Sequence, residues 1–147
     1  MTGSYELLDL EVDDDRWPAV LPVLLELRPH LDAASLRALY AEGWPQGYRF
    51  TALVDGRGCI SVAGWRIVAT AASGRKLYVD DLVTASARRS TGGGRGLLAH
   101  LQERAMDAGC TVLDLDSGVH RFDAHRFSLR ERMQISAHHF STPLPRA

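Results

Sequence analysis

Hydrophobic and polar residues follow two kinds of pattern along the chain. Strand-like runs, either alternating or rich in β-branched residues, are interrupted by segments in which apolar residues recur at helical spacing. The order strand, helix, helix, three strands, helix, strand, helix, strand predicts an α/β (α+β) fold with a mixed sheet and helices on both faces. The expected strands are 5–11, 48–54, 59–71, 77–84, 111–115 and 134–140, and the expected helices are about 14–28, 32 to the stop at Gly43, 97–108 and 122–132.

Composition narrows this picture to one soluble domain. The 147 residues, 46% of them hydrophobic, suit a single core, so we expect one domain over 1–147. The formal net charge of −1 gives no reason to expect nucleic acid or a membrane surface as a partner. The N-terminus carries no signal-peptide pattern, no apolar run is long enough to span a bilayer, and the two cysteines lack metal-ligand spacing. We therefore expect a cytoplasmic protein with no metal site.

One segment, ARRSTGGGRG at positions 87–96, combines arginines with four glycines just before a helix. A helix N-terminus exposes unpaired N–H groups and a partial positive charge, and glycines leave the approach to it open. The segment therefore predicts a diphosphate site. The spacing matches neither the GxxxxGK[ST] nor the GxGxxG nucleotide motif, and a merely flexible surface turn is the alternative.

The same segment resembles a known family motif. Arg89-x-x-Gly92-x-Gly94 followed by Leu97-Leu98 is similar to the [RQ]xxGx[GA] acyl-CoA pyrophosphate motif of the GNAT N-acetyltransferase superfamily. The flanking stretches LYVDDLVT, TVLDLDSG, AHRF and LRPHL resemble those of its bacterial members. The resemblance implies a mostly antiparallel sheet splayed between strands 77–84 and 111–115, with acetyl-CoA in the gap.

The resemblance also implies which residues hold acetyl-CoA. The backbone of one strand would pair with the pantetheine, and the glycine-rich segment would hold the diphosphate. Further contacts are expected from the end of strand 111–115 and from the AHRF helix. The implied residues are Leu82, Val83, Thr84, Arg89, Ser90, Gly92, Gly93, Gly94, Arg95, Gly96, Ser117 and His125.

Acetyl transfer to an amine needs a base, because an alkylamine with a pKa near 10.4 is almost wholly protonated at pH 7. Asp80 and Asp81 are adjacent on a predicted strand, so we expect their side chains on opposite faces, with one in the cleft. We favour Asp81 as the catalytic base. The alternative is an acidic pair that is solvated or paired with Arg75 or Lys76. The acceptor side is expected to include Trp44, Asp80, Asp116 and His120.

The position after AHRF departs from the family pattern. Relatives commonly carry a tyrosine there that protonates the departing thiol, whereas this chain has Ser128. A serine hydroxyl is far less acidic than a phenol, although it could hold a water, so we expect slower chemistry. We also note Arg132, where relatives often have glycine.

The function that we expect is transfer of an acetyl group from acetyl-CoA to a primary amine of a small molecule or peptide, by direct attack in a ternary complex. One alternative is an acyl-CoA-binding sensor or accessory protein with weak or lost catalysis, which Ser128 would permit. Another is a nucleic-acid binder that uses RRSTGGGR. We further expect a possible homodimer, paired through the alternating segment QISAHHF.

Overall fold

The computed structural model describes residues 4–89 and 91–146. The chain divides into two compact units, residues 1–115 and 116–147, and each is described by itself. The expectation of a single domain over 1–147 stays a prediction.

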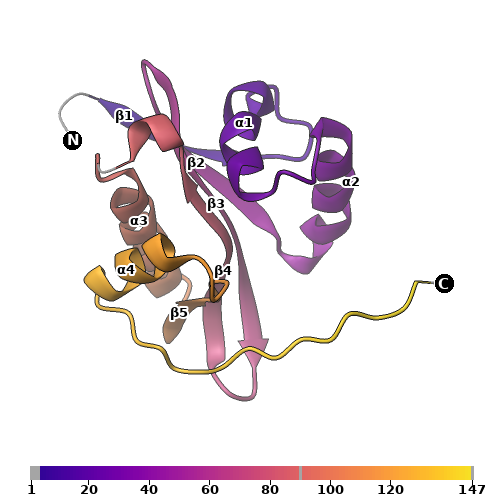
Figure 1. The fold of residues 1–147 in the computed structure, drawn as a ribbon, viewed down its shortest axis with the longest axis vertical. Helices are drawn as coiled ribbons and strands as arrows, with labels where there is room; N and C mark the ends of the chain where they lie inside the picture. The colour runs from indigo at the N-terminus through magenta and orange to yellow at the C-terminus, as the bar shows by residue number, and fades with distance from the viewer. Residues whose placement is uncertain (1–3, 90, 147) are drawn as a thin grey trace. The chain divides into compact units, whose positions relative to one another are not determined.

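The first unit is built on one five-stranded sheet whose strands lie in the order in which they occur in the chain (Figure 1). Neighbouring strands are antiparallel from β1 to β4, and β5 runs parallel to β4. The prediction of a mixed, mostly antiparallel sheet is confirmed. The strands are β1 (Tyr5–Leu10), β2 (Arg49–Asp55), β3 (Gly58–Thr70), β4 (Gly74–Thr84) and β5 (Val112–Leu115).

Helices cover both faces of this sheet, as predicted. Figure 1 shows α1 (Trp17–Leu27) and α2 (Ala33–Gly43) on one side and α3 (Gly93–Asp107) on the other. Helix α1 begins three residues later than expected, with a proline in its first turn, where the missing N–H costs nothing. Helix α2 begins with a capping box between Asp32 and Ser35.

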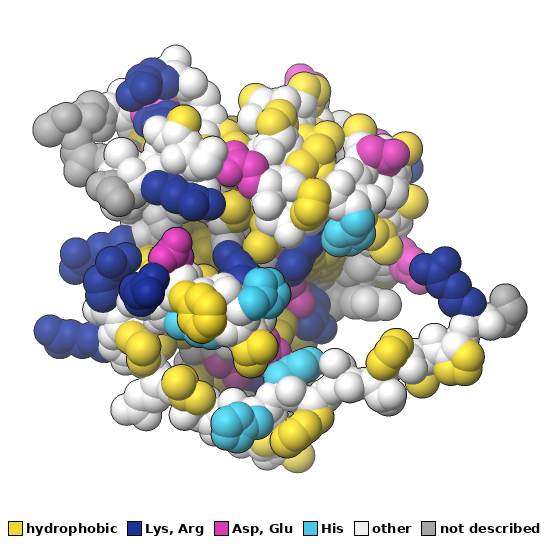
Figure 2. Space-filling model, in the orientation of Figure 1, with side chains coloured by type: hydrophobic (Ala, Val, Ile, Leu, Met, Phe, Trp, Pro, Cys, Tyr) yellow, Lys and Arg dark blue, Asp and Glu magenta, His cyan; other side chains and the backbone are white. Residues whose placement is uncertain are grey.

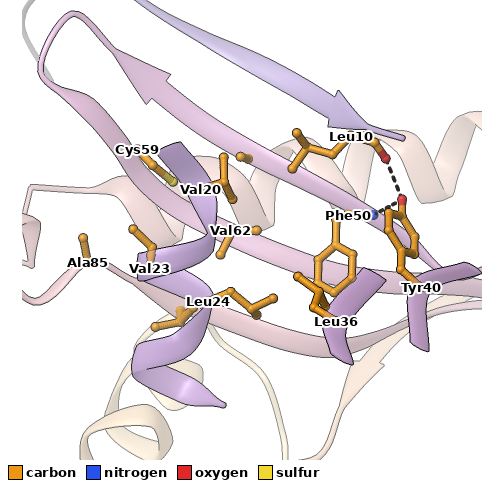
Figure 3. Close-up of a cluster of buried hydrophobic side chains, with 12 residues drawn as sticks. Leu10, Val20, Val23, Leu24, Leu36, Tyr40, Phe50, Cys59, Val62 and Ala85 are labelled. Carbon is orange, nitrogen blue, oxygen red and sulfur yellow. Dashed lines mark hydrogen bonds between the residues drawn. The ribbon is translucent and has the colours of Figure 1, made fainter. Parts of the chain in front are cut away.

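Two apolar clusters hold these layers together. The cluster on the α1 and α2 side includes Leu24, Leu36 and Phe50, and the cluster on the α3 side includes Leu97 and Leu101. Figure 3 shows the first cluster, in which the hydroxyl of Tyr40 donates to the carbonyl of Leu10 and accepts from the amide of Phe50. Burial raises the pKa of Tyr40 to about 12, so this hydroxyl stays protonated and keeps α2 tied to the sheet.

Strand β4 contains a β-bulge in its pairing with β3. Trp65 pairs with Val79 and Gly64 pairs with Asp81, so Asp80 is an extra residue with no partner on β3. On its other edge, β4 pairs with β5 only from Lys76 to Val79, opposite Val112 to Leu115. The segment 80–84 therefore continues beyond the end of β5, which leaves the splay that the resemblance implies.

The second unit contains one helix, α4 (Phe122–Arg130), which ends two residues earlier than expected. The predicted strand over 134–140 is wrong, because residues 134–146 form neither helix nor strand (Figure 1). The apparent alternation fails on spacing: Ile135 and Phe140 are five residues apart, so a strand would place them on opposite faces. They are 80% and 90% exposed, and Figure 2 shows hydrophobic side chains along this segment. Among the helices of the described residues, none is long and apolar enough to cross a membrane.

Candidate functional site

The start of α3 is built from backbone rather than side chains. Gly92 precedes the helix with a φ of +86°, a left-handed conformation that favours glycine. Gly93 is buried against β3, where an added Cβ would collide with Ile60 Cγ2. The Ser61 hydroxyl donates to the Gly93 carbonyl at 3.2 Å and fixes the helix start to the sheet. Three of the first four residues of α3 are glycines, so few side chains stand in the way of an approach to the unpaired N–H groups at this helix start.

The arginines around this helix start have different surroundings. The Arg88 side chain forms an ion pair with Asp55. Arg89, the arginine of the motif, is exposed, and so is Arg95 in the first turn. Gly94 and Gly96 are half-buried in the same turn. Ser90 lies outside the described residues.

The other part of the expected acetyl-CoA site is the end of β4. Leu82, Val83 and Thr84 pair with β3 on one edge, opposite Ala63, Val62 and Ser61. Their other edge lies past the end of β5. The side chains of this segment point into the core on the two faces of the sheet, Val83 into one cluster and Leu82 against the other. A ligand at this edge would therefore meet backbone groups. An open strand edge next to a glycine-lined helix start fits a pantetheine arm and a diphosphate.

Asp81 lies where the bulge of β4 meets the α1 and α2 face. Its carboxylate is buried, with 6% of the residue exposed, and both oxygens accept hydrogen bonds. Arg28 Nε, at the end of α1, donates to Asp81 Oδ1 at 2.8 Å, and the Tyr48 hydroxyl donates to Asp81 Oδ2. Arg28 also donates to the carbonyl of Asp80 at 3.0 Å. The partner of Asp81 is thus Arg28 and not Arg75 or Lys76.

The expectation that Asp80 and Asp81 point to opposite faces is wrong. Asp80 forms a bidentate pair with Arg66, at 2.8 and 2.9 Å. Arg66 lies on the face opposite to its neighbours Trp65 and Ile67, which pack on the α3 side. The extra residue in β4 interrupts the alternation, so both carboxylates lie on the α1 and α2 face.

The surroundings of Asp81 act on its pKa in opposite directions. Burial raises the pKa of Asp81 and is the dominant cause, while the hydrogen bond from Tyr48 and the charge of Arg28 lower it. The pKa of Tyr48 is raised far above its usual value by burial and by the neighbouring carboxylate. Tyr48 therefore stays protonated and donates a hydrogen bond to Asp81. Of the two groups, Asp81 is the one that can exchange a proton.

A cavity of about 310 Å³ opens beside this carboxylate. Its polar wall is formed by Asp81, Tyr48, Arg28 and His30, and the rest of its wall is apolar. The apolar lining residues are Leu24, Leu31, Leu36, Leu39 and Phe50.

Trp44, the predicted pocket residue, is not among the lining residues that the structure describes. Its ring instead stacks under the Arg49 guanidinium, 3.6 Å from the ring centroid, and contacts the ring of Tyr40. Trp65 is buried and donates through Nε1 to Thr51 Oγ1 at 3.0 Å, as a core residue does.

The remaining predicted site residues lie in the second unit. Asp116 Oδ2 lies 3.3 Å from His139 Nδ1, and His120 is exposed. His125 Nε2 lies 2.8 Å from the carbonyl of Gly118. Ser117 Oγ is buried without a hydrogen-bond partner among the described residues.

Ser128 lies in α4 and donates through Oγ to the carbonyl of Ala124 at 3.0 Å, one turn earlier in the same helix. Its proton is therefore already engaged within the helix.

Sequence comparison assigns the family. The profile of the Acetyltransferase (GNAT) family matches residues 9–130, which include the cavity, the glycine-rich helix start and all of α4. The chain belongs to the GNAT acetyltransferase family. The uncharacterized N-acetyltransferase YhdJ of Bacillus subtilis (strain 168) is 33% identical over 114 residues, which cover 77% of this chain and 80% of that protein.

Solved structures share the GNAT fold at low identity. A transcriptional regulator from Bacillus halodurans C-125 superposes with a TM-score of 0.78 at 18% identity, covering 96% of this chain and 100% of its own. The aminoglycoside acetyltransferase meta-AAC0020, from an uncultured soil metagenomic sample and in complex with sisomicin, gives a TM-score of 0.77 at 12% identity, with coverage of 96% and 97%. At these identities the two structures show a shared fold and no more.

Sequence reasoning had assigned no role to Arg28 and His30, although both lie in the LRPHL stretch that resembles the GNAT pattern. Arg28 is 53 residues from its partner Asp81, so no local spacing could have joined them. Gly64 carries a weaker signal, a lone glycine within a β-branched strand. An added Cβ at Gly64 would collide with Asp81 Oδ2 and lie 2.8 Å from Phe50 Cε1, so this glycine makes room for the carboxylate.

Proposed function

We propose that this GNAT protein transfers an acetyl group from acetyl-CoA to a primary amine of a small molecule or peptide, by direct attack in a ternary complex. One observation carries the proposal. The buried carboxylate of Asp81 forms part of a cavity wall and is followed directly in β4 by the open edge at Leu82. A group able to take a proton thus lies beside the place where the resemblance puts the acetyl donor.

Acetyl-CoA would supply the acetyl group, and this chain's residues would orient it. The first-turn amides of α3 from Gly93 to Arg95 would bind the diphosphate, with positive charge from Arg89 and Arg95. The amide of Gly96, also expected there, already donates to the carbonyl of Gly92 at 2.9 Å. The open edge of Leu82, Val83 and Thr84 would pair with the pantetheine amides. Ser90, Ser117 and His125 stay predictions as further contacts.

Asp81 would act as the base. At pH 7 roughly one alkylamine molecule in a few thousand is unprotonated, which amounts to about 4 to 5 kcal/mol of barrier unless a base assists. Burial raises the pKa of Asp81 and so makes its carboxylate a stronger base than an exposed aspartate. The acceptor nitrogen bonds to the acetyl carbon, the carbon–sulfur bond breaks, and the proton that leaves nitrogen passes to Asp81. The thiolate that departs takes its proton from water.

A CoA-binding sensor or accessory protein with weak catalysis is the second candidate. The hydrogen bond from Ser128 to the carbonyl of Ala124 favours it, because the residue in place of the family's tyrosine has its proton engaged within α4. A thiol with a pKa near 8.5 still leaves passably without an acid, so we keep the enzyme as the first candidate.

The experiment is a steady-state assay of acetyl-CoA consumption with a panel of primary amines, with mass spectrometry of the acetylated product. Wild type should form the product, and Asp81→Asn should lower kcat by roughly 100-fold or more while acetyl-CoA binding is retained. Asp13→Asn, which breaks the exposed charge pair with Arg37 and lies outside both the cavity lining and the glycine-rich segment, serves as the charge-matched control. Retained binding with no acetylated amine in the panel would favour the sensor.

A homodimer and a cytoplasmic location stay predictions. The segment proposed for dimer pairing, 134–140, is not a strand in the isolated chain. Size-exclusion chromatography with mass measurement at dilute protein tests the dimer, and a monomer alone would contradict it.

A further inference from the structure

The cavity beside Asp81 has walls that favour an apolar ligand. Leu24, Leu36 and Phe50 are almost fully buried and belong to the core cluster drawn in Figure 3, so this side of the cavity is part of the packed core. Leu31 and Leu39 continue the apolar wall, and Leu39 is 49% exposed on α2. At about 310 Å³ the cavity lies at the small end of the range for ligand sites.

The charged side chains of the cavity wall already form an ion pair with each other. Among the lining residues that the structure describes, Asp81 is the one carboxylate, and it is paired with Arg28. The neighbouring Asp80 is paired with Arg66 at 2.8 Å. A second ammonium group on a ligand would find no unpaired carboxylate on this wall, and it would meet the positive charge of Arg28.

We propose that the acceptor is a primary monoamine with an apolar body, and that Leu39 is a specificity-determining residue for it. This inference rests on the proposed function, because it names the substrate class for the same cavity. The amine would lie at Asp81 and the apolar body along the leucine wall.

The same surroundings assist the chemistry of such an acceptor. An apolar wall disfavours the charged form of an amine, and the nearby positive charge of Arg28 acts in the same direction. Both effects oppose that of the Asp81 carboxylate, which raises the pKa of a bound ammonium, so they increase the fraction of nucleophilic free amine over that beside the carboxylate alone. A polyamine gains less binding free energy from this wall, because its other ammonium groups lose hydration there without meeting an unpaired carboxylate.

Leu39 is the residue at which this preference can be altered without opening the core. Its side chain is half-exposed, whereas the neighbouring wall residue Leu36 is buried. Leu39→Glu would place a carboxylate on the apolar wall and offer a partner to a second ammonium. Ala41→Glu is the matched control, because it adds the same charge to an exposed position of α2 that does not line the cavity.

The test compares three acceptors of equal chain length at saturating acetyl-CoA: n-hexylamine, hexamethylenediamine and ε-aminocaproate. A series from propylamine to n-hexylamine is measured beside them. We expect kcat/KM to rise roughly fourfold for each added methylene, and n-hexylamine to exceed the diamine and the amino acid by roughly tenfold or more. Leu39→Glu should reduce this preference over the diamine by roughly tenfold, and Ala41→Glu should leave it unchanged.

Calorimetric binding of the same amines separates this inference from the proposed function. Preferred binding of n-hexylamine that Leu39→Glu weakens, without turnover, would uphold the ligand class and overturn the enzyme. Turnover that is flat along the alkyl series, or highest for the diamine or ε-aminocaproate, would uphold the enzyme and overturn the ligand class. Binding of none of the amines would overturn the ligand class as well.

Discussion

The hydroxyl of Tyr48 donates a hydrogen bond to Asp81 Oδ2 beside the Cα of Gly64, where a Cβ would lie 3.0 Å from that hydroxyl. The three residues come from separate parts of the sheet: Asp81 is on β4, Gly64 is opposite it on β3, and Tyr48 immediately precedes β2. The base that we propose is therefore held by a neutral donor on one oxygen and a cation, Arg28, on the other.

Replacing Tyr48 with phenylalanine should change the pH dependence of transfer in one direction. A base works in its ionised form, so kcat/KM rises with pH through the pKa of Asp81. The hydrogen bond from Tyr48 lowers that pKa, so Tyr48→Phe should move the acidic limb of the kcat/KM profile to higher pH. The profile is measured with one amine at several pH values. An acidic limb that stays in place, or moves to lower pH, contradicts the role of Asp81 as the base.

Gly64→Ala should disturb Asp81 and the core together. The added Cβ would collide with Asp81 Oδ2 and lie 2.8 Å from Phe50 Cε1. Overpacking of this kind costs about 1 to 3 kcal/mol, so we expect a lower midpoint in urea and a loss of transfer activity. Gly56→Ala is the control, because a Cβ there meets nothing within 4 Å. Equal stability of the two variants would show that the site tolerates the extra atom.

Ser128→Tyr should raise the rate of transfer if the wild type is a weakened enzyme. A positioned general acid is worth roughly 100-fold or more, and serine at this position donates to its own helix instead. Transfer to the amine panel is compared for Ser128→Tyr and Ser128→Phe, which share the ring and differ in the hydroxyl. A rise of the same size in both variants would show that the phenol proton is not responsible.

Arg132→Gly should stabilise the end of α4. Arg132 has a φ of +64°, and the amide of Met133 donates back to the carbonyl of Ser128 at 3.0 Å, as in a helix end that favours glycine. We expect a gain of about 0.5 to 1 kcal/mol in the free energy of unfolding, measured by urea titration. Arg130→Gly, within the helix, should lower it by about 1 kcal/mol. A loss in both variants would contradict the left-handed conformation at Arg132.

Local pattern was enough to predict most of the fold. Alternation located the strand around Phe50, and helical spacing located α3 through Leu97 and Leu101, whose apolar side chains lie in the core clusters. The pattern failed at 134–140, where polar and apolar residues alternate by chance and no described strand pairs with the segment.

The site was harder to predict than the fold for two physical reasons. A bulge leaves no clear mark in sequence, so the extra residue Asp80 and its effect on the direction of both carboxylates could not be foreseen. The partners of Asp81 come from distant parts of the chain, at Arg28 and Tyr48. The glycine-rich helix start could be predicted from the sequence, because the residues that form it are consecutive in the chain.

The most direct test of the account is a calorimetric titration of acetyl-CoA into the full-length protein, with Gly94→Glu as the comparison. We predict micromolar binding to wild type and loss of that binding in Gly94→Glu, because a carboxylate in the first turn of α3 would repel the diphosphate. Circular dichroism checks that the variant keeps its fold. Absence of binding to wild type, or equal binding to both proteins, would contradict an acetyl-CoA site at the start of α3 and the acetyl transfer that depends on it.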